Sequence, residues 1–248
     1  MRTQYVAGNW KLNGNLKSNH SLIEGIMEAN QSNLAVKCIV FPPAIYLPQI
    51  ANLCQDSAIQ YGAQNIYPES NGAYTGEISV DMIKEFGGRY VLVGHSERRH
   101  IFKEDEKFIA NKFHHIKEHD MIPILCIGET LEEYQQGRTE DIIEQQLRSV
   151  VRDANTFNDC VIAYEPVWAI GTGHTASPEL AQSVHLFIRS VLSNINESSA
   201  VTTSILYGGS VNAQNASLLF SMPDIDGGLV GGASLDANKF VEIIKCIS

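Results

Sequence analysis

Three residues that can act as acids, bases or electrophiles stand within a few residues of the ends of short apolar runs: Lys11, His95 and Glu165. A neutral imidazole at a helix N-terminus can donate a hydrogen bond to a carbonyl oxygen, because the helix dipole disfavours the imidazolium. Glu165 precedes Pro166, which favours an extended backbone, and the apolar residues 167–170 could cover its carboxylate and make it more basic. Singly, each of the three has an ordinary structural explanation. Together they indicate general acid–base chemistry.

Glycines gather after two of the later apolar runs, at Gly208-Gly209 and at Gly231-Gly232. Each pair alone would be an ordinary turn, but glycine also lets the main chain approach a phosphate closely. With Lys11, Ser210 and Gly171, the two pairs predict a cradle for a small anion.

The segments that would position these residues alternate between apolar runs and stretches with helical spacing. Most runs are continuously apolar, which is typical of parallel strands covered on both faces. Eight runs are predicted as strands, at 5–7, 38–41, 59–63, 90–93, 121–127, 160–164, 204–207 and 229–230. Helices are predicted at 18–30, 105–118, 139–152, 178–192 and 213–219. Thr139 and Ser177 are the expected N-caps of two of them.

Eight strand–helix units in 248 residues predict a closed (β/α)8 TIM barrel, whose usual size is about 250 residues. An open doubly wound α/β sheet is the structural alternative. No Ser/Gly linker, low-complexity tract or abrupt change of charge divides the sequence, so residues 1–248 are expected to form a single barrel domain. In such a barrel the site is built by loops after the carboxyl ends of the strands, where the residues above stand.

The composition narrows the classes of function. The chain is 44% hydrophobic, and 18 Lys and Arg against 28 Asp and Glu give a formal charge of −10 at pH 7. This acidity disfavours nucleic acid as a partner, whereas a local cluster of donors can still hold a small anion. The five cysteines are odd in number and have no zinc spacing, and the sequence has no signal peptide or membrane-spanning run. A cytoplasmic protein without membrane association or metal is predicted.

Two further motifs fail in their context. The sequence 115–119 fits an H-x-x-E-H zinc pattern, but the expected buried face of its helix is Ile109, Phe113 and Ile116, which leaves the histidines to the side or in solvent. Residues 171–176 fit the dinucleotide motif G-x-G-x-x-A, but the preceding strand is expected to end near Tyr164, too far away for the tight turn that this motif needs. A glycine-bearing mobile loop explains that segment better.

The segment 64–77 is long for a connection between elements. It carries Ile66, Tyr67 and Tyr74, which would be exposed unless something covers them. Two interpretations stay open: a solvated excursion, or docking into a second subunit that buries the rings.

Five segments together resemble the triosephosphate isomerase family, and the resemblance covers the whole chain. Their order, spacing and joint presence make it specific. The resemblance implies a TIM barrel, a homodimer, and interconversion of dihydroxyacetone phosphate and glyceraldehyde 3-phosphate through an enediol(ate) in glycolysis and gluconeogenesis, without metal or organic cofactor. The segments are Gly8–Lys11, Gly94–Arg99, Cys126–Glu129, Ala163–Gly173 and Tyr207–Ser210.

The resemblance also implies roles for individual residues, which are those assigned within that family. Glu165 would be the base that moves the proton, and His95 the neutral electrophile that acts on the substrate oxygens. Lys11 would hold the phosphate and polarise the substrate, with Asn9 beside it and Glu97 as its ionic partner.

The phosphate and the lid involve further residues on the same resemblance. Gly171, Ser210, Gly231 and Gly232 would supply amides to the phosphate, and Thr75 would reach towards the site of a partner subunit. Members of the family commonly carry lysine where this chain has His174, at the C-terminal hinge of the lid; the difference concerns lid kinetics and not the chemistry. The lid would consist of Pro166, Val167, Trp168, Ala169, Ile170, Gly171 and Thr172.

Two other functions fit parts of the pattern. Another phosphosugar barrel enzyme would share the phosphate cradle, but an aldolase needs a Schiff-base lysine or a metal set, and Lys11 is the one candidate at the expected strand ends. A non-catalytic phosphometabolite-binding protein would be expected to lack the base or the electrophile, whereas this sequence has both Glu165 and His95.

Overall fold

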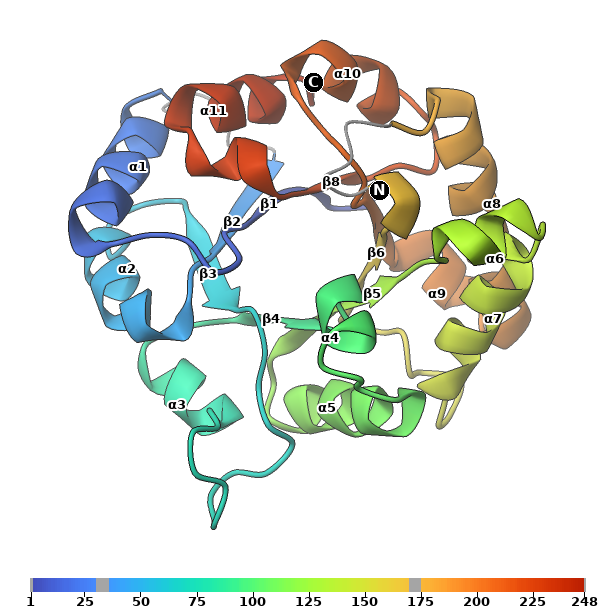
Figure 1. Cartoon of the computed structure of the whole chain (residues 1–248), viewed down its shortest axis with the longest axis horizontal. Helices are drawn as coiled ribbons and strands as arrows, with labels where there is room; N and C mark the ends of the chain where they lie inside the picture. Colours follow the sequence, from blue (N-terminus) through green and yellow to red (C-terminus); the bar gives the residue numbers. More distant parts are fainter. Residues whose placement is uncertain (1, 30–35, 170–174, 248) are drawn as a thin grey trace.

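A computed structural model describes residues 2–29, 36–169 and 175–247 of the chain. Within them, eight parallel strands pair in chain order and β8 pairs with β1, so the sheet closes into a barrel that the helices surround (Figure 1). The closed sheet confirms the predicted barrel and excludes the open doubly wound sheet. The strands are β1 (Gln4–Asn9), β2 (Val36–Phe41), β3 (Gln60–Ala63), β4 (Tyr90–Val93), β5 (Ile122–Ile127), β6 (Val161–Tyr164), β7 (Ser204–Tyr207) and β8 (Gly227–Val230).

Each predicted run overlaps one of these strands, and the runs are apolar because both faces of the sheet are covered. In β4, Tyr90 and Leu92 belong to a buried cluster made only of strand residues, which fills the inside of the barrel. Val91 and Val93 belong to the larger cluster that the strands share with the helices. Alternate residues of one strand therefore pack into two apolar layers, and the barrel interior is closed by side chains.

The helices form the outer ring, joined by the short 3-10 helices η1 (Ala44–Tyr46), η2 (Val167–Ala169) and η3 (Gly232–Leu235). In the described parts of the chain, all five predicted helices are present, five more lie between them, and α11 follows the last. The helices are α1 (Leu16–Ala29), α2 (Leu47–Leu53), α3 (Val80–Glu85), α4 (Ser96–His100), α5 (Glu106–Glu118), α6 (Leu131–Gln135), α7 (Thr139–Ser149), α8 (Pro178–Ile195), α9 (Glu197–Thr202), α10 (Ala213–Phe220) and α11 (Ala237–Lys245).

One of the two predicted N-caps is correct. The Ser177 hydroxyl accepts a hydrogen bond from the Leu180 N–H at 3.2 Å and caps α8. Thr139 is not an N-cap: Arg138 holds that position in α7, and no side chain caps the helix. The chain reaches α7 from α6 through Gly137 at φ 70°, so a tight turn replaces the extended residue that a side-chain cap requires.

The buried face of α5 is the predicted one, with Ile109, Phe113 and Ile116 fully buried. The rings of His115 and His119 lie 4.3 Å apart beside this face. In the described ranges, no three His, Cys, Asp or Glu side chains are grouped as they would be in a metal site. Of the helices described, none combines the length and apolar composition needed to cross a bilayer.

The connection from β3 to α3, residues 64–79, projects from the side of the barrel at the bottom of Figure 1. Ile66 is only 1% exposed, because the main core of the chain itself covers it. The Tyr67 ring packs on Tyr74 at 4.4 Å between centroids, and on Phe108 at 5.8 Å. Tyr74 stays 41% exposed at the projecting end of the segment.

Candidate active site

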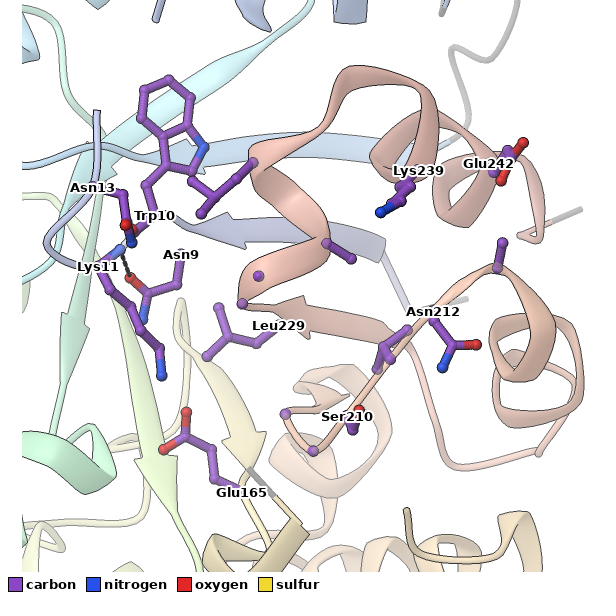
Figure 2. Close-up of a pocket in the computed structure, with 18 of the residues that line it drawn as sticks. Asn9, Trp10, Lys11, Asn13, Glu165, Ser210, Asn212, Leu229, Lys239 and Glu242 are labelled. Atoms are coloured by element: carbon purple, nitrogen blue, oxygen red, sulfur yellow. Dashed lines mark hydrogen bonds between the residues drawn. The ribbon is translucent and has the colours of Figure 1, made fainter. Parts of the chain in front are cut away.

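A cavity of about 650 Å³ opens at the carboxyl ends of the strands. Figure 2 shows side chains reaching it from segments that follow β1, β6, β7 and β8. The predicted residues Lys11, His95 and Glu165 all line it, although they lie far apart in the sequence. Its lining is Asn9, Trp10, Lys11, Asn13, His95, Glu165, Gly208 to Gln214, Leu229, Gly231 to Ala233, Leu235, Lys239 and Glu242.

Lys11 follows β1 in an unusual backbone conformation, with φ 52°. Two hydrogen bonds hold the backbone there: the Lys11 N–H donates to Asn9 Oδ1 at 3.1 Å, and the Gln64 side-chain amide donates to the Lys11 carbonyl at 2.8 Å. The Lys11 ammonium pairs with Glu97 at 2.7 Å, as the resemblance implied. A cation is therefore fixed at the mouth of the barrel with its charge partly compensated.

His95 is buried at the N-cap of α4, the short helix that follows β4. Its Nδ1 accepts a hydrogen bond from the Glu97 N–H at 3.3 Å. An imidazole nitrogen that accepts carries no proton, so in the neutral ring the proton sits on Nε2. That Nε2 lies 3.2 Å from Glu165 Oε1. The ring therefore presents a donor to the same space that the carboxylate occupies.

Glu165 follows β6 and is 3% exposed. Its Oε2 accepts a hydrogen bond from the Ser96 backbone N–H at 3.1 Å. The neighbouring strand ends leave little room: a Cβ at Gly208 would lie 2.7 Å from Glu165 Cγ, and a Cβ at Gly128 would lie 1.9 Å from the Glu165 carbonyl oxygen. The two glycines are thus required by the close approach of Glu165. They keep its carboxylate directed at His95.

The opposite side of the cavity is made of backbone. Ser210 follows β7, while Gly231 and Gly232 follow β8, and all three line the cavity. The helix η3 starts at Gly232, so its first N–H groups have no carbonyl partner inside the helix. A Cβ at Gly231 would lie 3.8 Å from Lys11 Cε, which places this backbone beside the lysine. Peptide donors and one ammonium group thus share this side.

The described part of the predicted lid is Pro166 to Ala169, most of it in η2. The apolar residues here were expected to be able to cover Glu165, which is buried. Among them, the Trp168 indole N–H donates to Glu129 Oε1 at 2.9 Å. The Tyr164 hydroxyl donates to the same oxygen at 3.1 Å. Glu129 is fully buried, and burial raises the pKa of its carboxyl. The tryptophan is therefore anchored to the end of β5.

The remaining predicted residues divide into two groups. Ile170, Gly171 and Thr172 lie outside the described residues, as does His174. Thr75 is described but exposed on the projecting segment 64–79, and it does not line the cavity of its own chain.

Three contributors were missed by sequence reasoning alone. The Ser96 N–H and the Gln64 amide act through contacts across strand ends, which no local pattern reveals. Glu129 did carry a signal, because it is an acid directly after a predicted strand. Trp10 and Cys126, which belong to two of the segments that carry the resemblance, are buried.

Known proteins resemble this chain over its whole length. The family model described as "Triosephosphate isomerase" matches residues 4–247. The chain is 56% identical over 249 residues to a triosephosphate isomerase of Legionella pneumophila (strain Paris), with 100% of both chains covered. It is 50% identical over 247 residues to a triosephosphate isomerase of Vibrio sp. (strain ANT-300), covering 99% of this chain and 98% of the other. A match of this extent leaves no part of the barrel unaccounted for, and the chain belongs to the triosephosphate isomerase family.

Proposed function

We propose that this protein is an enzyme that interconverts dihydroxyacetone phosphate and D-glyceraldehyde 3-phosphate, a step of glycolysis and gluconeogenesis, by proton transfer through an enediol(ate). Membership of the family supports this reaction. The observation that carries the proposal is the position of the His95 Nε2 donor 3.2 Å from the Glu165 carboxylate, in a cavity that also holds Lys11.

In this reaction Glu165 is the base. Its carboxylate takes a proton from the carbon beside the carbonyl and returns it to the neighbouring carbon, which exchanges aldehyde and ketone. The Ser96 N–H binds the carboxylate at 3.1 Å, so Glu165 leaves this hydrogen bond as it moves to the substrate. Glu165 is buried, so little water surrounds the carboxylate that must accept the proton.

His95 is the electrophile. Its Nε2–H donates a hydrogen bond to the carbonyl oxygen, where negative charge develops as the proton leaves carbon. A neutral ring suits this role because Nδ1 is occupied by the Glu97 N–H. The same Nε2 serves both oxygens of the enediol(ate) as the proton moves between the carbons.

Lys11 and the glycine backbone bind the phosphate end. The Lys11 ammonium, with Asn9 beside it and Glu97 as counter-ion, places a positive charge between the phosphate and the reacting oxygens. The phosphate amides are proposed to be those of Gly171, Ser210, Gly231 and Gly232. Residues 166–172 are proposed to close over the substrate as a lid and exclude water, which protects the enediol(ate) from loss of phosphate.

We further propose that the protein is a cytoplasmic homodimer that binds neither nucleic acid nor membranes and needs no cofactor. The projecting segment 64–79, with the exposed residues Tyr74 and Thr75, supports a second copy as the partner. Other exposed apolar side chains follow neighbouring strands, including Leu12 at 96% and Ile45 at 81%. Such a concentration is typical of a surface that becomes buried on association.

A coupled assay of glyceraldehyde 3-phosphate conversion, with a chelator present, tests the reaction. Glu165→Asp withdraws the carboxylate by about one bond and is expected to lower kcat roughly 100-fold, while binding of inorganic phosphate persists. Glu242→Asp is the matched control, since it shortens an acid that lines the rim of the same cavity. Unchanged turnover in Glu165→Asp would remove Glu165 from the mechanism. Phosphate binding without turnover in the unaltered protein would favour a non-catalytic binding protein.

A further inference from the structure

The cavity continues beyond the segments at Ser210 and at Gly231-Gly232, which are proposed to bind the phosphate and are here called the phosphate loops. In Figure 2 the labelled side chains run from Lys11 and Glu165, past Ser210, to Asn212 and Lys239 on the other side. All of them line one cavity of about 650 Å³. Cavities of about 300–1,000 Å³ hold drug-sized ligands, and a triose phosphate is much smaller than that. The substrate therefore leaves the part around Asn212 and Lys239, here called the outer pocket, unfilled.

The outer pocket has a hydrogen-bond donor with a fixed orientation. Asn212 is the N-cap of α10, and its Oδ1 accepts from the Gln214 N–H at 2.9 Å and from the Asn215 N–H at 3.1 Å. These two bonds fix which end of the amide is oxygen. The Nδ2 group is left over as the donor, and it bonds to no residue within the described ranges. Because α10 caps its own first N–H groups with Asn212, the amide is what remains for a ligand.

The outer pocket also has a cation. Lys239 lies in the first turn of α11, exposed at the cavity wall, and it pairs with no acid among the residues that the structure describes. Lys11, in contrast, is paired with Glu97 at 2.7 Å. Glu242, one turn further along α11, is the acid of this rim. In a chain with a formal charge of −10, an unpaired ammonium in a cavity is a local site for an anion.

We propose that Asn212 Nδ2 and Lys239 Nζ form a second anion subsite, adjoining the phosphate loops on the side away from Glu165. This inference rests on the proposed function, because it takes Ser210 and Gly232 to hold the substrate phosphate. A group in the outer pocket then lies beyond that phosphate and not along the carbon chain. The ligand class is therefore a diphosphate, whose first phosphoryl group occupies the loops and whose second occupies the subsite. Such a compound inhibits by competing with substrate.

Inhibition by inorganic phosphate and by inorganic diphosphate, at constant ionic strength and without divalent metal, tests the subsite. The inhibition constant of diphosphate is expected to be at least about tenfold lower than that of phosphate, which a single added charge-assisted hydrogen bond already predicts. Lys239→Met and Asn212→Asp are each expected to remove most of this preference. Aspartate keeps the N-cap acceptor of α10 while replacing the donor with an oxygen, so the helix is retained. Lys245→Met, on the exposed last turn of the same helix, should keep the full preference.

The ratio of the two constants is measured within each variant, so a change in folding or turnover cancels. Equal inhibition constants for phosphate and diphosphate in the unaltered protein would overturn the subsite. A preference for diphosphate that all three variants retain would also overturn it, because the higher charge of diphosphate would then explain the preference. If the unaltered protein showed no isomerase activity, the proposed function would fail; calorimetric titration with the same two anions would then decide the subsite by itself.

Discussion

The side-chain amide of Gln64 donates hydrogen bonds to the carbonyls of Lys11 and Phe41, at 2.8 Å and 2.9 Å. It thereby ties the ends of β1 and β2 to the start of the segment after β3. Lys11 needs this support because its φ of 52° lies in the left-handed region, which non-glycine residues rarely adopt. Such a conformation persists only where its surroundings hold it. Gln64 is therefore a positioning residue for the ammonium group of Lys11.

Replacement of Gln64 by alanine is expected to raise KM for glyceraldehyde 3-phosphate more than it lowers kcat, with kcat/KM reduced about tenfold. The reason is that Lys11 loses its fixed place beside the proposed phosphate site, while Glu165 and His95 keep theirs. Steady-state kinetics measure the effect. Gln49→Ala is the control, because Gln49 donates to the Leu16 carbonyl at 2.6 Å on the outer surface. A KM equal to that of the control would show that Lys11 does not depend on Gln64.

Replacement of His95 by glutamine tests the electrophile. The amide donates a weaker and differently placed hydrogen bond to the carbonyl, so kcat is expected to fall by about 100-fold or more. The carbonyl stretching frequency of bound dihydroxyacetone phosphate should shift less than it does in the unaltered protein. Infrared spectroscopy of the complexes measures the shift, and an equal shift in both proteins would refute this role of His95.

A buried histidine that takes no part in the reaction should influence stability in acid. His185 is fully buried, packs against the rings of Tyr164 and Tyr207, and donates from Nδ1 to the Asp224 carbonyl at 3.2 Å. Burial, followed by the nearby charge of Arg189, lowers its pKa to about 3. The unfolded chain, with an ordinary pKa of about 6.5, binds the proton first. The folded state therefore loses stability as the pH falls from about 6.5 towards 3.

The variant His185→Gln should remove the one proton that His185 takes up when the chain unfolds in acid. The slope of the unfolding free energy against pH is then expected to decrease by about 1.4 kcal/mol per pH unit between about pH 4 and pH 6. Urea unfolding at a series of pH values gives the slope. His20→Gln is the control, since His20 is exposed on α1 and pairs with Glu24 at the surface. Identical slopes for the two variants would mean that His185 does not remain neutral in the folded state.

The projecting segment 64–79 tests the proposed dimer. The chain has a mass of 27.4 kDa, and sedimentation equilibrium is expected to give twice that mass. Thr75→Arg places a charge on the exposed end of the segment and should shift the equilibrium towards the monomer. Gln145→Arg makes the same change on an exposed position of α7 and should not. A monomeric mass for the unaltered protein would contradict the proposal.

The strands, and the three residues that meet in the cavity, could be predicted from the sequence for one physical reason. Both faces of each barrel strand are buried, so the strands appear as apolar runs, and the residue after a run stands at the barrel mouth. Lys11, His95 and Glu165 were found in this way. The helices α2, α3, α6 and α9 escaped prediction because each has only five to seven residues, too few to show a helical period.

Two further features were not predicted: the helix α11, which has a pattern in the sequence, and the hydrogen bond from Ser96 to Glu165, which has none. In α11, Phe240, Ile243 and Ile244 are spaced as one buried helical face, and this pattern was available in the sequence. The hydrogen bond from the Ser96 N–H to Glu165 had no such signal, since backbone groups are the same at every residue. Contacts of this kind depend on where the strand ends meet, which only the folded chain determines.

The absence of a side chain at Gly208 leaves the room that Glu165, the proposed base, occupies. A methyl group there would lie 2.7 Å from Glu165 Cγ, closer than packed carbon atoms allow, so the carboxylate would have to swing aside. An alanine at this position would thus slow catalysis without ever touching the triose. Gly208 should therefore be kept when variants of this barrel are designed, because any side chain there would move the Glu165 carboxylate from its place.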